Sequence, residues 1–128
     1  MYLAFICGST YIYAQPRIIK VNSLNNSPNE VSIAIDPTNP ARMVAGANLQ
    51  AIYYSSDSGK TWIEKEMKSS MGVYGDPVIH ADGKGNFYFG HLAKNKRLIK
   101  SAYAGLDRIV IQKSVDGGQT FSDGDFPF

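Results

Sequence analysis

The stretch that decides the fold class is Ser55-Ser56-Asp57-Ser58-Gly59-Lys60-Thr61-Trp62, which returns 59 positions later as Ser114-Val115-Asp116-Gly117-Gly118-Gln119-Thr120-Phe121. Both copies have the form S-x-D-x-G-x-T followed by an aromatic residue, and both follow a run of strand-forming residues. Serine and aspartate side chains bond nearby backbone N–H groups in turns, and glycine supplies a positive φ. The threonine and the aromatic residue then favour a new strand whose ring packs on a core. Each copy therefore predicts a β-hairpin corner.

Short strand-forming runs alternate with turn clusters along the rest of the chain. The first series of runs is predicted at 31–35, 42–49, 51–55 and 61–66. The second series is predicted at 76–80, 86–93 and 108–113, with a fourth strand starting at Thr120. No segment shows the caps and apolar periodicity of a helix. The pattern predicts an all-β fold of two four-stranded units.

The two units also align outside the corner motif. Ile35 aligns with His80 and Val44 aligns with Tyr88, so that a strand, a polar turn and a second strand match in both units. The second unit is longer by an insertion at 94–107. Insertions between repeated strands commonly form surface loops, which is what we expect here.

These motifs resemble the Asp-box, or BNR repeat, of sialidases and related β-propeller proteins, and the segments 29–40 and 75–89 are similar to the first two strands of their blades. The resemblance implies a partial propeller over residues 16–128, with one blade at about 29–68 and a second at about 75–128. The structural Asp-box residues are then Ser55, Asp57, Gly59, Thr61 and Trp62, followed by Ser114, Asp116, Gly118, Thr120 and Phe121. Because propellers have four to eight blades, we expect the remaining blades to come from a longer chain or from assembly.

Composition and charge narrow the range of partners. A formal charge of +2 on 128 residues is too small to indicate nucleic-acid binding. Lys94, Lys96, Arg97 and Lys100 form a basic cluster inside the insertion, and we interpret it as a solvated loop. Neither nucleic acid nor a membrane-spanning segment is expected.

Residues 1–15 are typical of the apolar core of a secretory signal peptide, because the first sixteen residues contain no charged side chain. The segment is too short to span a membrane and lacks a basic residue before Arg17. An apolar first strand is the alternative. The export interpretation predicts a secreted, periplasmic or cell-surface protein. Cys7, the only cysteine, falls in this segment, so that no disulfide or cysteine-based zinc site is expected.

Asp76 is the candidate catalytic residue that the resemblance implies. Sialidases use a tyrosine nucleophile together with an acid/base carboxyl group. In the family the acid/base aspartate commonly lies after the first Asp-box, in the phrase that opens the next blade, and Asp76 in Tyr74-Gly75-Asp76-Pro77 has that position. The alternative is that Asp-Pro only starts a strand.

The arginine pattern departs from the family. Three arginines bind the substrate carboxylate in sialidases, and the first stands on the innermost strand of the first blade. The corresponding stretch here is Asn29-Glu30-Val31-Ser32-Ile33, with an acid where the cation is expected. Two hypotheses therefore remain open. One is the leading part of a secreted exo-α-sialidase-like glycoside hydrolase, inactive as this fragment. The other is a non-catalytic secreted propeller that binds sialylated glycans, other glycans or protein.

No metal or cofactor is predicted. His80 and His91 lack metal-ligand spacing, so that packed or surface roles are expected for both. Asp116, Asp123 and Asp125 suggest a calcium loop but lack the spacing of the twelve-residue site. The tyrosines that could stack on sugars, and that strand packing explains equally well, are Tyr53, Tyr54, Tyr74 and Tyr103.

Overall fold

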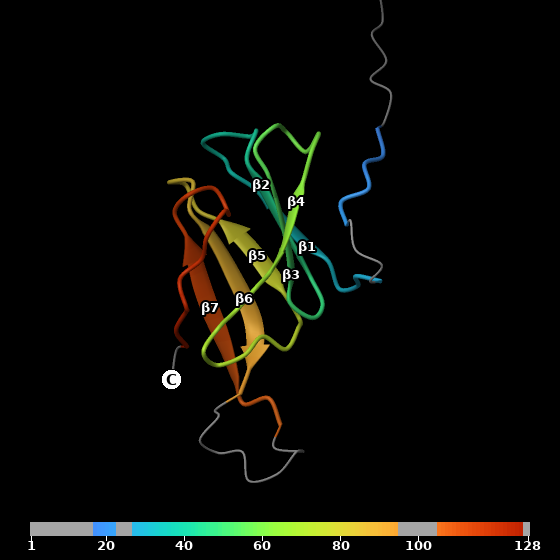
Figure 1. The fold of residues 1–128 in the computed structure, drawn as a ribbon. Helices are drawn as coiled ribbons and strands as arrows, with labels where there is room; N and C mark the ends of the chain where they lie inside the picture. The colour runs from blue at the N-terminus through green and yellow to red at the C-terminus, as the bar shows by residue number, and fades with distance from the viewer. Residues whose placement is uncertain (1–16, 23–26, 95–104, 127–128) are drawn as a thin grey trace, which may run out of the picture.

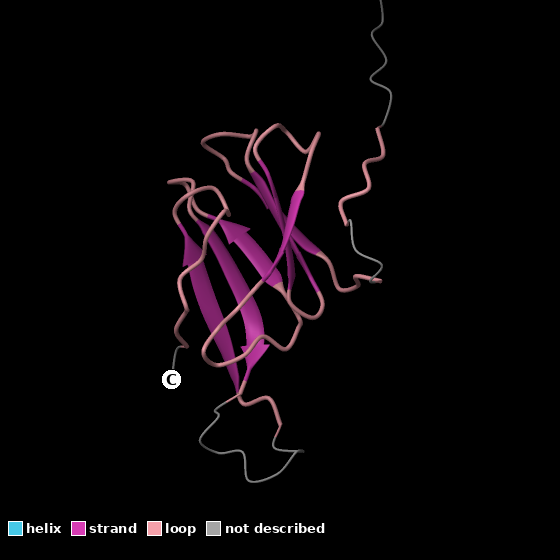
Figure 2. Ribbon diagram, viewed as in Figure 1, coloured by secondary structure: helices cyan, strands magenta, loops and turns pink. Residues whose placement is uncertain are grey.

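The computed structural model describes residues 17–22, 27–94 and 105–126, which form two antiparallel β-sheets and no helix (Figures 1 and 2). The first sheet has the order β1 (Ser32–Ile35), β2 (Met43–Ala47), β3 (Ala51–Ser55) and β4 (Ile63–Glu66). The second has the order β5 (Val78–Ala81), β6 (Phe87–Ala93) and β7 (Arg108–Ser114). The all-β prediction is confirmed. The predicted signal segment 1–15 and most of the insertion lie outside the described residues.

Among the residues that the structure describes, the second sheet has three strands, so the predicted fourth strand from Thr120 is not formed there and that prediction is wrong. Ser122 still donates its backbone N–H to the Lys113 carbonyl at 2.9 Å, as the first residue of such a strand would. Gly124 then adopts a φ of +89°, and Asp125 makes only an isolated bridge with Ile111. A left-handed residue inside a strand disrupts the pairing ladder, as in a β-bulge.

The pairing register corrects the alignment of the two units. Within the first sheet Ile35 is opposite Met43 on β2, which is opposite Ser55 of the motif. Within the second sheet the motif serine Ser114 is opposite Phe87, and Phe87 is opposite Ala81. Ile35 therefore corresponds to Ala81 and not to His80. The turn between β1 and β2 is two residues longer than the turn between β5 and β6, whereas the sequence alignment allows for a difference of one. The first strands of the two units are therefore misaligned by one residue.

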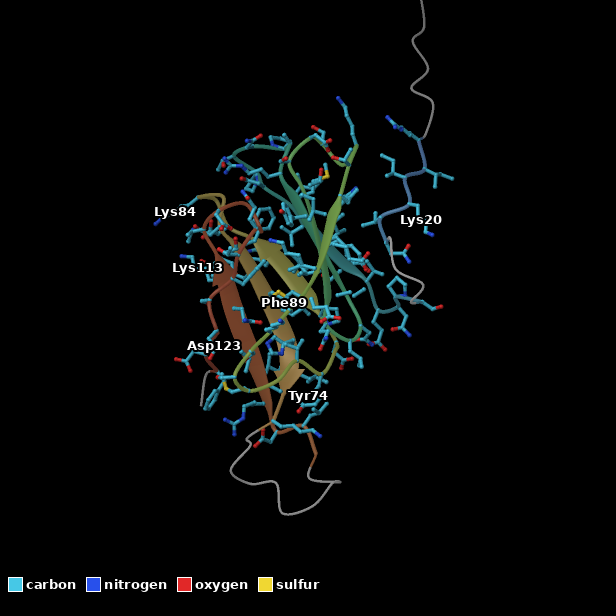
Figure 3. The ribbon with its side chains drawn as sticks, in the orientation of Figure 1. Lys20, Tyr74, Lys84, Phe89, Lys113 and Asp123 are labelled. Atoms are coloured by element: carbon cyan, nitrogen blue, oxygen red, sulfur yellow. The ribbon has the colours of Figure 1, made fainter. Side chains whose placement is uncertain are left out.

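The main core lies between the two sheets. Side chains from both sheets form it together with Met67, which directly follows β4; the sheet residues are Val44, Ile52, Ile79, Phe87 and Phe89. Gly46 allows the sheets to approach closely, because a Cβ at this position would lie 2.9 Å from the Phe89 ring. Figure 3 shows Phe89 on β6, the central strand of the second sheet. The two sheets therefore stack face to face around a close-packed interior.

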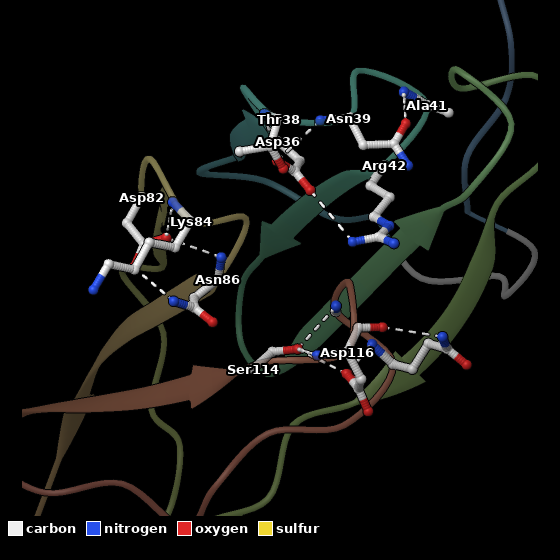
Figure 4. A network of polar contacts seen from close by, with 12 residues as sticks. Asp36, Thr38, Asn39, Ala41, Arg42, Asp82, Lys84, Asn86, Ser114 and Asp116 are labelled. Atoms are coloured by element: carbon white, nitrogen blue, oxygen red, sulfur yellow. Dashed lines mark hydrogen bonds and ion pairs between the residues drawn. The ribbon is translucent and has the colours of Figure 1, made fainter.

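Each corner motif forms the same hydrogen-bond network. In the first copy the Gly59 N–H donates to Ser55 Oγ at 3.0 Å, and the Thr61 N–H donates to Asp57 Oδ1 at 2.9 Å. The Thr61 hydroxyl donates to Asp57 Oδ2 at 2.6 Å. The second copy repeats these bonds through Ser114, Asp116, Gly118 and Thr120 at 2.9, 2.9 and 2.6 Å. Figure 4 shows Ser114 and Asp116 at this corner.

The aromatic residues of the two motifs pack on different surfaces. Phe121 lies against the core between the sheets, with its ring edge-on to Phe89 at a centroid distance of 6.3 Å. Trp62 packs on the outer face of the first sheet with Tyr53 and Val21. Both rings therefore anchor a corner to a hydrophobic cluster, as the motif predicts.

Asp57 is expected to titrate well below an ordinary aspartate. The hydroxyl and N–H of Thr61, followed by the Ser55 hydroxyl, lower the pKa of Asp57 from 3.8 to about 2. Because the folded pKa lies below the unfolded value, the ionised carboxylate stabilises the fold above about pH 4. That contribution is lost as the pH falls through about 2.

A ¹³C NMR titration of the Asp57 carboxyl carbon measures this pKa directly. Thr61→Val removes the largest cause and is expected to raise the midpoint, while Thr120→Val, at the equivalent position of the other motif, leaves it unchanged. An unchanged midpoint in Thr61→Val would contradict the assignment.

Candidate functional site

The candidate acid Asp76 lies just before β5 and is exposed to solvent. Its backbone N–H donates to Asn48 Oδ1 at 2.7 Å, so that the loop after β2 holds it in place. Its φ is +50°, a left-handed conformation that aspartate tolerates better than most residues. Asp76 is thus positioned by the first sheet, although it belongs to the second.

Glu30 occupies the equivalent position before β1, and its φ is +51°. Asn48 also donates its Nδ2–H to the Glu30 carboxylate, so that one amide side chain joins both acidic residues. The equivalence extends to the backbone: the Asn48 N–H donates to the Asn29 carbonyl and the Leu92 N–H to the Gly75 carbonyl, both at 3.0 Å.

The acidic pair is located where the two sheets meet. Glu30 precedes β1 and Asp76 precedes β5, and these two strands lie against each other. The family resemblance marks Glu30 only as an acidic residue in a segment where an arginine is expected. The signal that could have found the pair is the equal spacing from Glu30 to Ile35 and from Asp76 to Ala81. The arrangement places two carboxylates at the same end of neighbouring strands.

The two arginines in the strands and their turns, Arg42 and Arg108, each form an ion pair with a nearby aspartate. Arg42 forms an ion pair with Asp36 at 3.6 Å. Arg108 forms two hydrogen bonds with Asp107, the shorter at 2.8 Å, and lies over the ring of Phe126. These pairings stabilise the turns and the edge of the second sheet.

Two further aspartates organise the hairpin turns. Asp36 begins the turn after β1, and a hydrogen bond from the Thr38 hydroxyl, with others from nearby N–H groups, lowers its pKa (Figure 4). Asp82 begins the equivalent turn after β5, where the Asn86 amide lowers its pKa. Because both carboxylates accept bonds from their own turn, we interpret them as structural.

The structure does not bring the two histidines together. His91 is buried on β6 against Phe89, with Nδ1 at 2.9 Å from the Leu92 carbonyl oxygen. His80 is exposed on the opposite face of the second sheet, beside Tyr88. Within residues 17–22, 27–94 and 105–126, no three acidic, histidine or cysteine side chains are grouped in a way that could hold a metal.

The aspartates of the suggested calcium loop have other partners. Asp123 accepts hydrogen bonds from the backbone N–H and hydroxyl of Ser70, and so joins the last described segment to the loop after β4. Asp125 accepts the Phe126 N–H. Asp116 accepts hydrogen bonds from the N–H and hydroxyl of Thr120 in the second corner motif. The three carboxylates therefore have separate structural roles.

The tyrosines proposed for sugar stacking are used in different ways. Tyr53 is buried on the outer face of the first sheet. Tyr54 lies beneath the Lys65 ammonium at 5.0 Å from its ring centroid, and Tyr74 lies beneath that of Lys94 at 4.7 Å. Tyr74 is near the end of β6 in Figure 3, where the acidic pair also lies. Tyr103 is outside the described residues.

The outer face of the second sheet carries an open apolar groove of about 460 Å³. Asp76 lies on its border, and aliphatic and aromatic residues form its walls, chiefly Val78, Tyr88, Leu92, Ile109 and Ile111. The exposed fractions of Val78 and Ile109 are 63% and 58%. A surface of this composition is suited to contact with another apolar surface.

Comparison with protein-family models, with curated proteins and with solved structures finds no match to this chain. The described part of the chain has no helix of the length and apolarity needed to cross a membrane.

Proposed function

We propose that the two sheets are consecutive blades of an exported, sialidase-like Asp-box β-propeller directed at glycans. Three features support the proposal: the two corner networks are equivalent, the sheets stack face to face, and β1 lies against β5. Propeller blades surround a central channel, and the resemblance to sialidases implies that the first strand of each blade lies nearest to it. Glu30 and Asp76 would then both face the region where propeller binding sites form.

Asp76 is the proposed acid/base group, and the observation that carries this assignment is its placement. It is an exposed carboxylate, held in a left-handed conformation by an asparagine from the neighbouring sheet, at the junction of β1 and β5. Backbone conformations of this kind persist where the surrounding structure enforces them, often at functional sites. From this position a carboxyl group could donate a proton to a glycosidic oxygen and later accept one from water.

The test uses the protein expressed from its native open reading frame and a fluorogenic sialoside. Asp76→Asn is expected to lower kcat/KM by about 10²–10⁴-fold, the usual contribution of general acid–base catalysis. Glu66→Gln, an exposed carboxylate at the end of β4, serves as the control and is expected to leave kcat/KM unchanged. Equal activity of Asp76→Asn and wild type, or no hydrolysis by the wild type at any pH, would contradict the hydrolase assignment.

The second candidate is a non-catalytic propeller that binds glycans or protein. It is favoured by Glu30, which occupies the position where the resemblance requires a substrate-binding arginine, and by the pairing of Arg42 and Arg108 with other carboxylates. In this case titration calorimetry with a neutral oligosaccharide, which the two carboxylates do not repel, detects binding without turnover. Its affinity is expected to fall in an Asp76→Asn, Glu30→Gln double variant.

A further inference from the structure

We propose that a second copy of this chain docks its first sheet onto the exposed face of the second sheet. The contact would reproduce, between copies, the stacking that joins the two sheets within one chain. This inference goes beyond glycan recognition, and it rests on the repeat relation between the sheets and not on any role of Asp76.

The exposed face of the second sheet is equivalent to the buried face of the first. The pairing register relates Val44 to Tyr88, Gly46 to Gly90 and Ile52 to Ile111. Ile52 is 2% exposed beneath the second sheet, whereas Ile111 is 45% exposed with nothing in the described chain covering it. The second sheet thus repeats the docking surface of the first but leaves it open.

Gly90 shows this equivalence at atomic scale. A Cβ on Gly46 would meet the Phe89 ring, Ile79 and Pro77, all at 2.9–3.2 Å. A Cβ on Gly90 would meet only Val78, at 3.7 Å and beyond, and Gly90 borders the apolar groove of about 460 Å³. The neighbouring sheet therefore fills the space beside Gly46, whereas the equivalent space beside Gly90 is open.

The outer face of the first sheet is equivalent, in turn, to the buried face of the second. Ile33 corresponds to Ile79, and Ala45 corresponds to Phe89. The small side chain of Ala45 leaves space that Val21 partly fills, and Figure 1 shows residues 17–22 beside the first sheet. Val31, Ile33 and Ile35 remain 66%, 57% and 51% exposed on or beside this face.

The open face of the second sheet and the exposed β1 side of the first sheet's outer face are therefore complementary to each other and not to themselves. Trp62 and Val21 cover the β2 and β3 side of that outer face. Each of the two free surfaces is apolar, each has the register of a face that is buried inside the chain, and the net charge of +2 opposes association only weakly. A contact between two different faces is head-to-tail, and it produces a ring if the rotation closes.

Sedimentation velocity on four samples tests the proposal. The wild type is expected to form oligomers over about 1 to 100 µM, a range typical of moderate interfaces. Ile111→Lys blocks one face and Ile33→Lys blocks the other, so that each variant alone is expected to be monomeric. An equimolar mixture retains one intact face of each kind and is expected to give a dimer and nothing larger.

Each alternative result decides against the proposal. A monomeric wild type would overturn it and would assign the open face to another covering segment or partner. Self-association of Ile33→Lys alone would show that two second sheets meet face to face. Circular dichroism checks that each variant folds, and Ile109→Lys, at a position that is 58% exposed, replaces Ile111→Lys if that variant does not. Glycan hydrolysis and binding by Asp76→Asn are separate measurements, so that failure of one proposal leaves the other intact.

Discussion

Replacement of Gly118 by alanine is expected to lower the free energy of unfolding by about 3 kcal/mol or more. Gly118 has a φ of +89°, where a side chain is strained. Its Cβ would also lie 2.3 Å from Val44 Cγ2 and 3.4 Å from Tyr54 Cβ on the first sheet. The second corner motif is therefore pressed against the first sheet at a point with no room for a methyl group.

Gly59 provides the matched control, because it is the same motif position in the other copy. Its φ is +75°, but the nearest atom to a Cβ is the Met43 sulfur at 3.3 Å, on a flexible side chain. Gly59→Ala is expected to lower stability by about 1–2 kcal/mol, the conformational penalty alone. Urea denaturation measures both variants. Equal losses would show that the second corner does not pack on the first sheet.

Replacement of Phe89 by alanine is expected to lower the free energy of unfolding by about 3–5 kcal/mol. The ring is fully buried and lies against Phe121 within its own unit and against Gly46 of the other sheet. Removing it leaves a cavity that two stacked sheets can close only in part. Val115→Ala, at a position that is 74% exposed in the second corner, is the control and is expected to change stability by less than about 0.5 kcal/mol.

The features that the sequence predicts well are those that depend on local chemistry. The corner motif predicts its own hydrogen bonds, because serine, aspartate and threonine bond backbone groups only a few residues away. Each of the seven observed strands overlaps a predicted run and extends at most one residue beyond it, since alternation and flanking turn residues define them. The strand predicted at 42–49 spans only Met43–Ala47, because Asn48 lies in the following loop, where its side chain accepts the Asp76 N–H.

The features that the sequence does not predict depend on non-local packing. The correspondence of Ile35 with Ala81 follows from strand pairing across turns of unequal length, which an alignment of letters does not register. The fourth strand fails at Gly124, whose positive φ is not encoded in a strand-forming pattern.

In the candidate site, too, the sequence predicts a local feature but not the contacts between distant segments. The family resemblance identified Asp76 from its phrase alone. Its bond to Asn48, and the position of Glu30 on the other side of that asparagine, require the loop of one sheet to meet the segment before the other. Such contacts between distant segments arise only when the two sheets stack.

The two sheets are repeats stacked face to face, with the Phe89 ring packed against Gly46, and a double-mutant cycle at these two residues tests this stacking. Gly46→Ala alone is expected to destabilise by about 1–3 kcal/mol through overpacking against Phe89. In the Gly46→Ala, Phe89→Ala double variant the new methyl group occupies space that the ring has left. The combined loss is therefore expected to fall short of the sum of the single losses by at least about 1 kcal/mol. Losses that add within about 0.5 kcal/mol would contradict the stacking of the two sheets at this point.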